Sequence, residues 1–315
     1  MREALKAALS ELFGRPVEPS EPVLLAGGAS KEAWAVDVDG EPLLVRRAAA
    51  TVMHAHTLSL EQEFDVLRAA HEAGVSVPRP YGYLPSVEGR EAFVMERLAG
   101  ETIGRRIVQR PELATARERL PLQLADEVAR IHAIPPERLP FLPTTGIGSL
   151  VEELDSVDEP HPAIELGLWW LREHPPPERE PVVAHGDFRI GNVVVGPDGL
   201  VGVLDWEFAH LENPARELAW PLVRAWRFGV DSRRLGGLGE VGPYLERYNE
   251  LTGRDVTEAE LAAWELAGNV SWAIGCLTQS RRHLSGLDRS VEYAVLGRLA
   301  AEVEYEILHL LEHAA

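Results

Sequence analysis

Hydrophobic and polar positions along the first hundred residues follow two different periods. Helical spacing of the apolar residues predicts an amphipathic helix over residues 2–13. Short apolar runs bounded by glycine, proline or aspartate predict five strands, at about residues 23–26, 33–38, 43–45, 81–84 and 92–95. A helix from Ser59 to Ala73 should interrupt these strands, because its apolar residues have helical spacing and Ser59 with Gln62 matches a capping box.

The remainder of the chain has mainly helical spacing. The predicted helices lie at about residues 113–134, 214–228, 241–252, 257–283 and 287–312. The segment 135–148 is rich in proline and threonine, which predicts a loop. The pattern therefore predicts an α+β protein with a small antiparallel sheet in its first part and mainly helices in the rest.

The stretch from Val182 to Phe208 departs from this helical pattern. Three short apolar runs, at 182–184, 193–195 and 200–204, are bounded by turn residues and predict short strands. Three polar side chains should lie at the ends of these strands or in the loops beside them, and they are Asp187, Asn192 and Asp205.

These three residues suit phosphoryl transfer. The reaction needs a carboxylate near the attacking hydroxyl and oxygen ligands for the magnesium on the nucleotide phosphates. Asp187 and Asn192 have the D-x-x-x-x-N spacing of a kinase catalytic loop, and Asp205 stands where a second magnesium ligand is expected. A structural alternative is that the carboxylates only cap turns.

Charge and composition exclude several classes of function. The 315 residues carry a net charge of −19, which argues against a nucleic-acid partner because phosphate binding needs a basic face. No run of 18 apolar residues predicts a membrane span, and the sequence around Glu3 lacks the apolar core of a secretory signal. The single Cys276 excludes an internal disulfide and fits a reducing compartment, so we expect a cytoplasmic protein.

The string HGDFRIGN followed by LDWE resembles the aminoglycoside phosphotransferase and choline kinase group of small-molecule kinases. The resemblance implies a bilobal protein-kinase-like fold, with a nucleotide-binding N-lobe at residues 1–97 and a catalytic C-lobe at 98–315. It implies ATP, or alternatively GTP, with Mg²⁺ and a small-molecule hydroxyl substrate. Asp187 would be the catalytic residue that orients the hydroxyl, and Asn192 and Asp205 would bind the metal.

The same resemblance assigns a nucleotide site in the first lobe. A glycine pair between two strands would cover the phosphates, and an arginine would replace the usual strand-three lysine, with Arg46 preferred to Arg47. Glu63 of the following helix would pair with that arginine, and Glu61 is the rival candidate for this role. The residues expected to contact or support the nucleotide are Gly27, Gly28, Ser30, Arg46, Glu63, Glu96 and Leu98.

Two residues should support the catalytic loop, and two alternative functions are disfavoured. His185 should orient the catalytic loop, and Glu217 should support it at a position where aspartate is usual in the resembling kinases. A nucleotide-binding pseudokinase is disfavoured because all three polar residues of the motif are intact. A dinucleotide-dependent oxidoreductase is disfavoured because the G-x-G-x-x-G string at 237–242 does not follow a predicted strand.

The acceptor is the least defined part of the sequence analysis. The net charge and the acidic residues between Glu152 and Glu159 favour an aminoglycoside or a choline-like amine, although solubility is a simpler explanation of the charge. Against an amine, GGASKEAW and LLVRR look closest to the kinase-like domains that can be fused to acyl-CoA dehydrogenases. Arginines that could recognise an anion are Arg224, Arg227, Arg233, Arg234, Arg281 and Arg282. We therefore rank a neutral or anionic hydroxyl metabolite, such as a hydroxyacyl-CoA, slightly above an aminoglycoside, with a choline-like amine and a sugar also open. No oligomeric state is predicted.

Overall fold

The computed structural model describes residues 1–25, 31–49, 57–157, 159–286 and 289–314. The predicted phosphate-loop residues Gly27, Gly28 and Ser30 lie outside the described residues. Within the described ranges, no helix is both long enough and apolar enough to cross a membrane.

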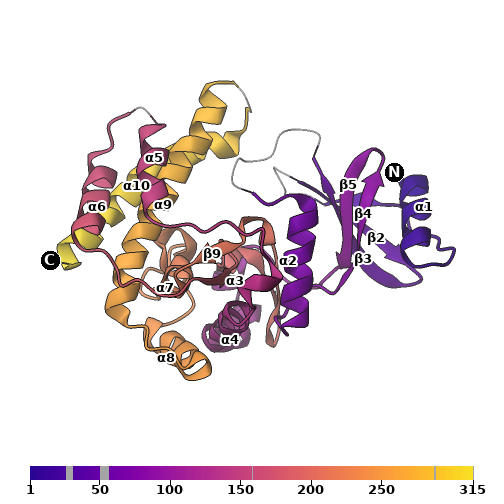
Figure 1. The fold of residues 1–315 in the computed structure, drawn as a ribbon, viewed down its shortest axis with the longest axis horizontal. Coiled ribbons are helices and arrows are strands. Elements are labelled where there is room, and N and C mark those ends of the chain that lie inside the picture. Colours follow the sequence, from indigo (N-terminus) through magenta and orange to yellow (C-terminus); the bar gives the residue numbers. More distant parts are fainter. Residues whose placement is uncertain (26–30, 50–56, 158, 287–288, 315) are drawn as a thin grey trace.

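A five-stranded antiparallel sheet forms the first part of the chain, in the order β1-β2-β3-β5-β4. Its strands are β1 (Val23–Leu24), β2 (Lys31–Val38), β3 (Glu41–Ala48), β4 (Pro80–Val87) and β5 (Arg90–Glu96). Helix α1 (Arg2–Leu12) lies on the outer side of the sheet, and α2 (Leu60–Glu72) lies between the sheet and the helical remainder (Figure 1). The sheet therefore presents one face outward and the other toward the second part of the chain.

Two apolar cores follow from this arrangement. Leu5 and Leu9 of α1 pack with Val36, Val45 and Val94 on the outer face of the sheet. The inner face and α2 belong to a second core, which continues into the C-terminal helices without interruption. Packing is therefore continuous across the segment that follows β5, and the division of the chain at residue 97 stays a prediction.

Helix α2 begins as its sequence predicted. The Ser59 hydroxyl accepts a hydrogen bond from the Gln62 amide at 3.2 Å, and the Gln62 side chain accepts one from the Ser59 amide at 3.0 Å. This capping box satisfies two of the backbone donors that a helix leaves open at its first turn. It also fixes where Glu63 enters the first turn.

The second part of the chain is mainly helical (Figure 1). Its α-helices are α3 (Gly104–Gln109), α4 (Ala114–His132), α5 (Gly148–Asp155), α6 (Pro162–Glu173), α7 (Pro214–Ala219), α8 (Val241–Thr252), α9 (Glu258–Leu284) and α10 (Val291–Ala314). The predicted α+β fold, with an N-terminal antiparallel sheet and a mainly helical remainder, is confirmed.

One local prediction was wrong, and one strand pairing was not predicted. The predicted helix over 214–228 is broken into α7 and two 3₁₀ turns, Trp220–Leu222 and Arg224–Arg227. Pro221 lies at the break and has no N–H to continue an α-helical ladder. Strand β6 (Val182–Ala184) does not join the hairpin of β7 (Val193–Gly196) and β8 (Gly199–Val203). It pairs with β9 (His210–Glu212), a strand that the apolar pattern did not indicate.

Candidate active site at the catalytic hairpin

Asp187 lies in the loop that follows β6. Gly186 before it has φ +82°, and a Cβ atom at this position would lie 2.1 Å from the Phe208 carbonyl oxygen and 2.9 Å from Nδ1 of His210. Only glycine combines this left-handed backbone with such a close approach. The HGD string therefore positions the carboxylate through the backbone before any side-chain contact is made.

The Asp187 carboxylate accepts hydrogen bonds from three side chains. Trp220 Nε1 donates to Oδ1 at 2.7 Å, and Asn192 Nδ2 donates to Oδ2 at 2.6 Å. Arg189 Nε approaches Oδ1 at 2.9 Å and Oδ2 at 3.1 Å. Hydrogen bonds to a charged group are stronger than neutral ones, so the orientation of this carboxylate is fixed from three directions.

His185 supports the same loop, as its sequence position suggested. Its Nε2 lies 2.7 Å from the Leu204 carbonyl oxygen, and the Asp187 amide donates to its Nδ1 at 3.2 Å. Because a carbonyl can only accept and an amide N–H can only donate, these contacts require a neutral ring protonated at Nε2. The fully buried imidazole thus ties the catalytic loop to the end of β8.

Glu217 supports the loop from α7. Its Oε1 accepts the Gly186 amide at 2.9 Å, and its Oε2 lies 3.0 Å from Nε2 of His132. The second ring nitrogen of His132 lies 2.8 Å from the Tyr248 hydroxyl. Glutamate, with its extra methylene, can therefore bond the catalytic-loop backbone at the position where the resembling kinases have aspartate.

Asn192 and Asp205 offer oxygen atoms that suit Mg²⁺. Both Asn192 Nδ2 contacts go to Asp187, one to the side chain and one to the main-chain oxygen at 2.9 Å, which leaves the amide oxygen directed elsewhere. The Leu204 amide donates to the Asn192 carbonyl at 2.8 Å, so Asp205 follows directly beside it. Asp205 adopts φ 62° and its side chain is 41% exposed. Hard oxygen donors in this pairing fit a divalent cation.

Arg46 connects the sheet to the hairpin. Its Nε lies 2.9 Å from Oε1 of Glu63, and its Nη1 lies 2.5 Å from Oδ1 of Asp205. Burial acts to raise the pKa of Asp205, but the Arg46 charge and hydrogen bond outweigh it and hold that pKa below its ordinary value. Burial likewise opposes the charged form of Arg46, and Glu63, Asp205 and Glu207 together raise its pKa.

The structure separates Arg46 from Arg47. Arg46 pairs across the sheet with Ala33 and faces α2, whereas Arg47 pairs with Glu32 on the opposite face. There Arg47 Nη2 lies 2.6 Å from Glu32, and its guanidinium lies over the Trp34 ring. Only Arg46 is therefore placed to face the hairpin. Glu61 is exposed, whereas Glu63 is buried against Arg46.

Lys31 is a second cation that sequence reasoning missed. It begins β2, is 4% exposed, and forms ion pairs with Glu63 and, at 3.1 Å, with Oε2 of Glu207. It follows Ser30, two residues before the start at residue 33 that the sequence predicts for this strand. Its two-residue spacing from Ala33 and Ala35, both on the inward face, was the signal that could have placed it in the strand.

Glu96 and Leu98, which the resemblance places in the connection between the lobes that should face adenine, occupy different settings. Glu96 ends β5, and its amide donates to the Arg79 carbonyl at 2.9 Å, so this N–H is committed to protein. Leu98 follows in the connection to the helical part, and its Cδ1 would lie 2.4 Å from a Cβ atom built at Gly202 of β8. Gly202 therefore allows the connecting segment to lie against the catalytic hairpin. Contact of Glu96 and Leu98 with adenine stays a prediction.

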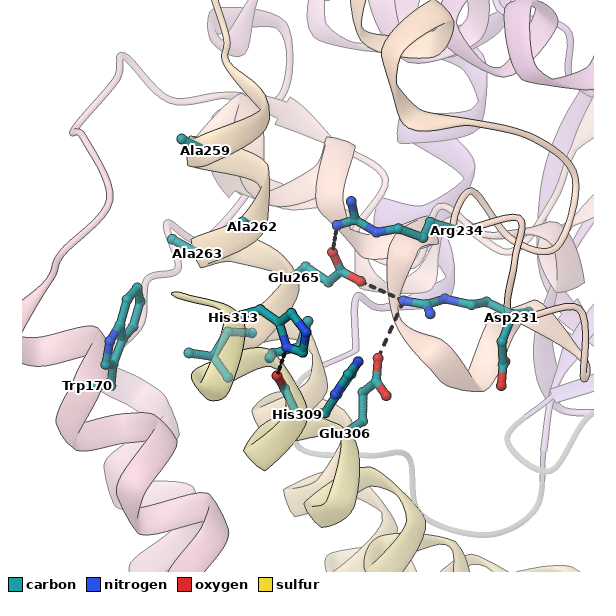
Figure 2. A pocket seen from close by; sticks show the side chains of 13 residues that line it. Trp170, Asp231, Arg234, Ala259, Ala262, Ala263, Glu265, Glu306, His309 and His313 are labelled. Atoms are coloured by element: carbon teal, nitrogen blue, oxygen red, sulfur yellow. Dashed lines mark hydrogen bonds and ion pairs between the residues drawn. The ribbon is translucent and has the colours of Figure 1, made fainter. Parts of the chain in front are cut away.

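Most of the six candidate anion-binding arginines are committed to protein groups. Arg227 donates to Glu265 at 2.6 Å, and Arg234 pairs with the other oxygen of the same carboxylate. Figure 2 shows Arg234 and Glu265 directed toward one another at the wall of a cavity of about 720 Å³. Burial raises the pKa of Glu265 against the opposing effect of both arginines. Arg233 and Arg281 donate to main-chain oxygens, and Arg282 lies over the Tyr293 ring.

Arg224 is likewise paired, with Asp231 at 3.1 Å and with Glu306 at 3.6 Å, but it also borders a cavity. It lines a cavity of about 550 Å³ between α3, the 3₁₀ turn at 224–227, α9 and α10. Trp272 lines this cavity and packs on Trp226 with centroids 4.6 Å apart. The Arg189 guanidinium in turn lies over Trp226, with its Cζ 4.3 Å from the centroid of the Trp226 ring. A chain of ring contacts therefore connects the cavity to the residue that binds Asp187.

Comparison with known proteins agrees with this geometry. Residues 22–251 match the model of the family described as "Phosphotransferase enzyme family". Among solved structures, a Ralstonia eutropha protein named as a candidate aminoglycoside phosphotransferase has a TM-score of 0.78 at 19% identity, covering 99% of this chain and 98% of the other. Spectinomycin phosphotransferase in complex with ADP and spectinomycin has a TM-score of 0.69 at 13% identity, with 98% of each chain covered.

Sequence relatives have a different architecture. Acyl-CoA dehydrogenase family member 11 of Gallus gallus is 28% identical over 227 residues, which are 66% of this chain and 29% of that protein. Family member 10 of Mus musculus is 24% identical over 282 residues, or 78% of this chain and 25% of that protein. The chain thus spans less than a third of the length of these relatives. The matched residues 22–251 contain the whole catalytic hairpin, and the chain belongs to the phosphotransferase enzyme family.

Proposed function

We propose that this phosphotransferase transfers the terminal phosphoryl group of ATP to a hydroxyl group of a small molecule. The observation that carries the proposal is the joint placement of Asp187, Asn192 and Asp205 on one loop and hairpin, opposite the Arg46–Glu63 pair. A pseudokinase is disfavoured, because a protein that only bound nucleotide would not need a carboxylate fixed by three donors.

Each residue has a role that follows from its contacts. Asp187 would accept the hydrogen bond of the acceptor hydroxyl and take its proton as the bond to phosphorus forms. Arg46, which contacts Asp205 of the hairpin, would hold the phosphates, and Glu63 would hold Arg46. Asn192 and Asp205 would hold Mg²⁺, which when bound neutralises charge on the phosphates. We place the nucleotide-binding groups in residues 1–97 and the acceptor site in 98–315.

A neutral or anionic acceptor is preferred to an amine. The 550 Å³ cavity beside Trp272 has Arg105 and Arg224 with Phe228 on its walls, although Asp231 and Glu302 also line it. Asp231 is paired with Arg224 at 3.1 Å, and Glu302 is exposed. Aromatic walls with arginines suit an acceptor that has an apolar part and a carboxylate or phosphate. A hydroxyacyl-CoA has these features and agrees with the names of the relatives.

An aminoglycoside or other amine is the second candidate. Asp155, Glu159 and Glu165 line a cavity of about 390 Å³ at α5 and α6, and such carboxylates could receive ammonium groups. These elements contribute none of the side chains that bond the Asp187 carboxylate. Names of the solved relatives, which include spectinomycin phosphotransferase, also point to this class.

The experiment compares ADP release with hydroxyacyl-CoA compounds and with kanamycin-type amines, at low and moderate salt. Phosphorylated product is identified by mass spectrometry, and Asp187→Asn serves as the control for background hydrolysis. We expect phosphorylation of the hydroxyacyl-CoA class. Efficient turnover of the amines alone, falling with salt as electrostatic steering is screened, would reverse the ranking.

A further inference from the structure

The number of donors around Asp187 creates a problem for the proposed reaction. A carboxylate has about four lone-pair positions. Trp220, Asn192 and the shared Arg189 Nε–H provide four contacts to its oxygens among the described residues. The acceptor hydroxyl also needs one of these positions. One donor must therefore leave, and the others must keep the carboxylate in place.

Arg189 is the donor best able to leave. One N–H is divided between two oxygens, and its side chain is 23% exposed and flexible. It lies over the Trp226 ring, so it can stay in contact with that ring after the carboxylate is released. Asn192, in contrast, is 5% exposed and makes two bonds to Asp187 from its amide nitrogen.

Trp220 is half-buried and is restrained by packing on its ring. Its ring packs near Trp226, with centroids 5.7 Å apart, and against α9, where a Cβ atom built at Gly268 would lie 3.6 Å from its Cε3. Trp220 also follows Glu217 by three residues, and the same short helical segment bonds both the Gly186 amide and the Asp187 carboxylate. An indole ring has few rotatable bonds, so this donor cannot follow a moving acceptor.

We propose that Trp220 is a positioning residue for phosphoryl transfer. Its N–H fixes Oδ1 of Asp187 while Asn192 fixes Oδ2, so the carboxylate keeps its orientation when the acceptor hydroxyl replaces Arg189. The inference rests on the proposed function, in which Asp187 orients the acceptor. It differs from packing support, because only the N–H of the ring is needed at the reaction centre.

The test removes that N–H and keeps an aromatic side chain. Trp220→Phe is compared with the wild type in ADP release from MgATP, with water as the acceptor. The isosteric replacement of Trp220 by 3-benzothienylalanine, which has sulfur in place of N–H, covers the case in which the phenylalanine variant does not fold. Both should lower kcat by about 10- to 100-fold, the effect of losing one hydrogen bond to a charged group. The KM for ATP should change little, whereas the Tm should fall by a few degrees, because the same hydrogen bond is present in the resting protein.

The control is Trp264→Phe on α9. Trp264 is buried, more completely than the half-buried Trp220, and its Nε1 has no hydrogen-bond partner within the described residues. Trp264→Phe should therefore leave kcat within about twofold of wild type, even where the loss of the indole ring lowers the Tm. A fall in kcat equal to that of Trp220→Phe would assign the effect to packing and overturn the inference.

A double-mutant cycle with Asp187→Asn completes the test. Because Trp220 acts through the Asp187 carboxylate, Trp220→Phe should lower the activity of Asp187→Asn by less than about twofold. Full multiplication of the two effects, or wild-type kcat in Trp220→Phe, would overturn the role of Trp220. Wild-type kcat in Asp187→Asn itself would instead overturn the proposed function, so the two failures are distinguishable.

Discussion

Replacement of Glu63 by glutamine tests the charged cluster behind the nucleotide site. Glu63 and Lys31 each expose 3% of their side chains, and Arg46 exposes 14%. Glutamine keeps the volume of Glu63 but removes its charge, and its amide N–H groups face cations that can only donate. Removing one partner from a buried ion pair costs about 3–5 kcal/mol. The Tm should therefore fall by roughly 6–20 °C.

The same substitution should weaken nucleotide binding. Without Glu63, Arg46 retains only its contacts with Asp205 and Glu207 and loses the anchor on its Nε. We expect the Kd for MgATP to rise by about tenfold, equivalent to 1.4 kcal/mol. Isothermal titration calorimetry at a temperature well below the lowered Tm measures this effect.

Glu61→Gln is the matched control on the same helix turn. Glu61 is exposed, so its substitution should change stability by less than about 0.5 kcal/mol and leave the Kd unchanged. The reasoning fails if Glu63→Gln has the Tm and the Kd of the wild type, or if Glu61→Gln shows equal losses.

Three further predictions concern the catalytic loop and its supports. Asp187→Asn should lower turnover by roughly 10²–10⁴ while the Kd for ATP stays nearly unchanged; turnover within a few-fold of wild type on the true substrate would contradict the role of Asp187. Asp205→Ala should weaken magnesium-dependent ATP binding, measured by calorimetry with and without magnesium, because it removes a hard oxygen ligand; an unchanged magnesium dependence would exclude Asp205 as a ligand. Burial acts to lower the pKa of His210, but Glu212, 2.8 Å away, raises it overall. Its stabilising contribution should therefore be complete below about pH 6.5 and lost as the pH rises through the higher folded pKa. His210→Gln should flatten this part of a Tm-versus-pH curve, and an unchanged slope would exclude the assignment.

Local periodicity was sufficient for most of the helices and strands. Helix α8 has the predicted bounds, 241–252, and the capping box of Ser59 placed the start of α2 correctly. The error at 214–228 came from apolar spacing that continues through Pro221, although the backbone cannot. Strand β9 was missed because only three residues form it, and its pairing with β6 is a long-range property that no local pattern encodes.

The residues of the candidate site also differ in how far the sequence could predict them. Asp187, Asn192 and Asp205 were predictable as a group because they lie close together along the chain, on one loop and hairpin. Lys31 and Trp220 were not predicted, because their contacts depend on how distant segments pack. The choice between Arg46 and Arg47 depended on strand register, since neighbouring residues in a strand point to opposite faces. A shift of one residue would have reversed the choice.

The ion pair between Arg46 and Asp205 would make nucleotide binding, as proposed above, an exchange of partners. The guanidinium that should hold phosphate is bound to the carboxylate that should hold magnesium. An incoming nucleotide without metal must compete with Asp205 for Arg46, whereas a magnesium complex offers each group a new partner of opposite charge. The protein would thereby discriminate against metal-free nucleotide even before chemistry begins. Loss of Asp205 should then tighten the binding of metal-free ADP, although it weakens binding of the magnesium complex.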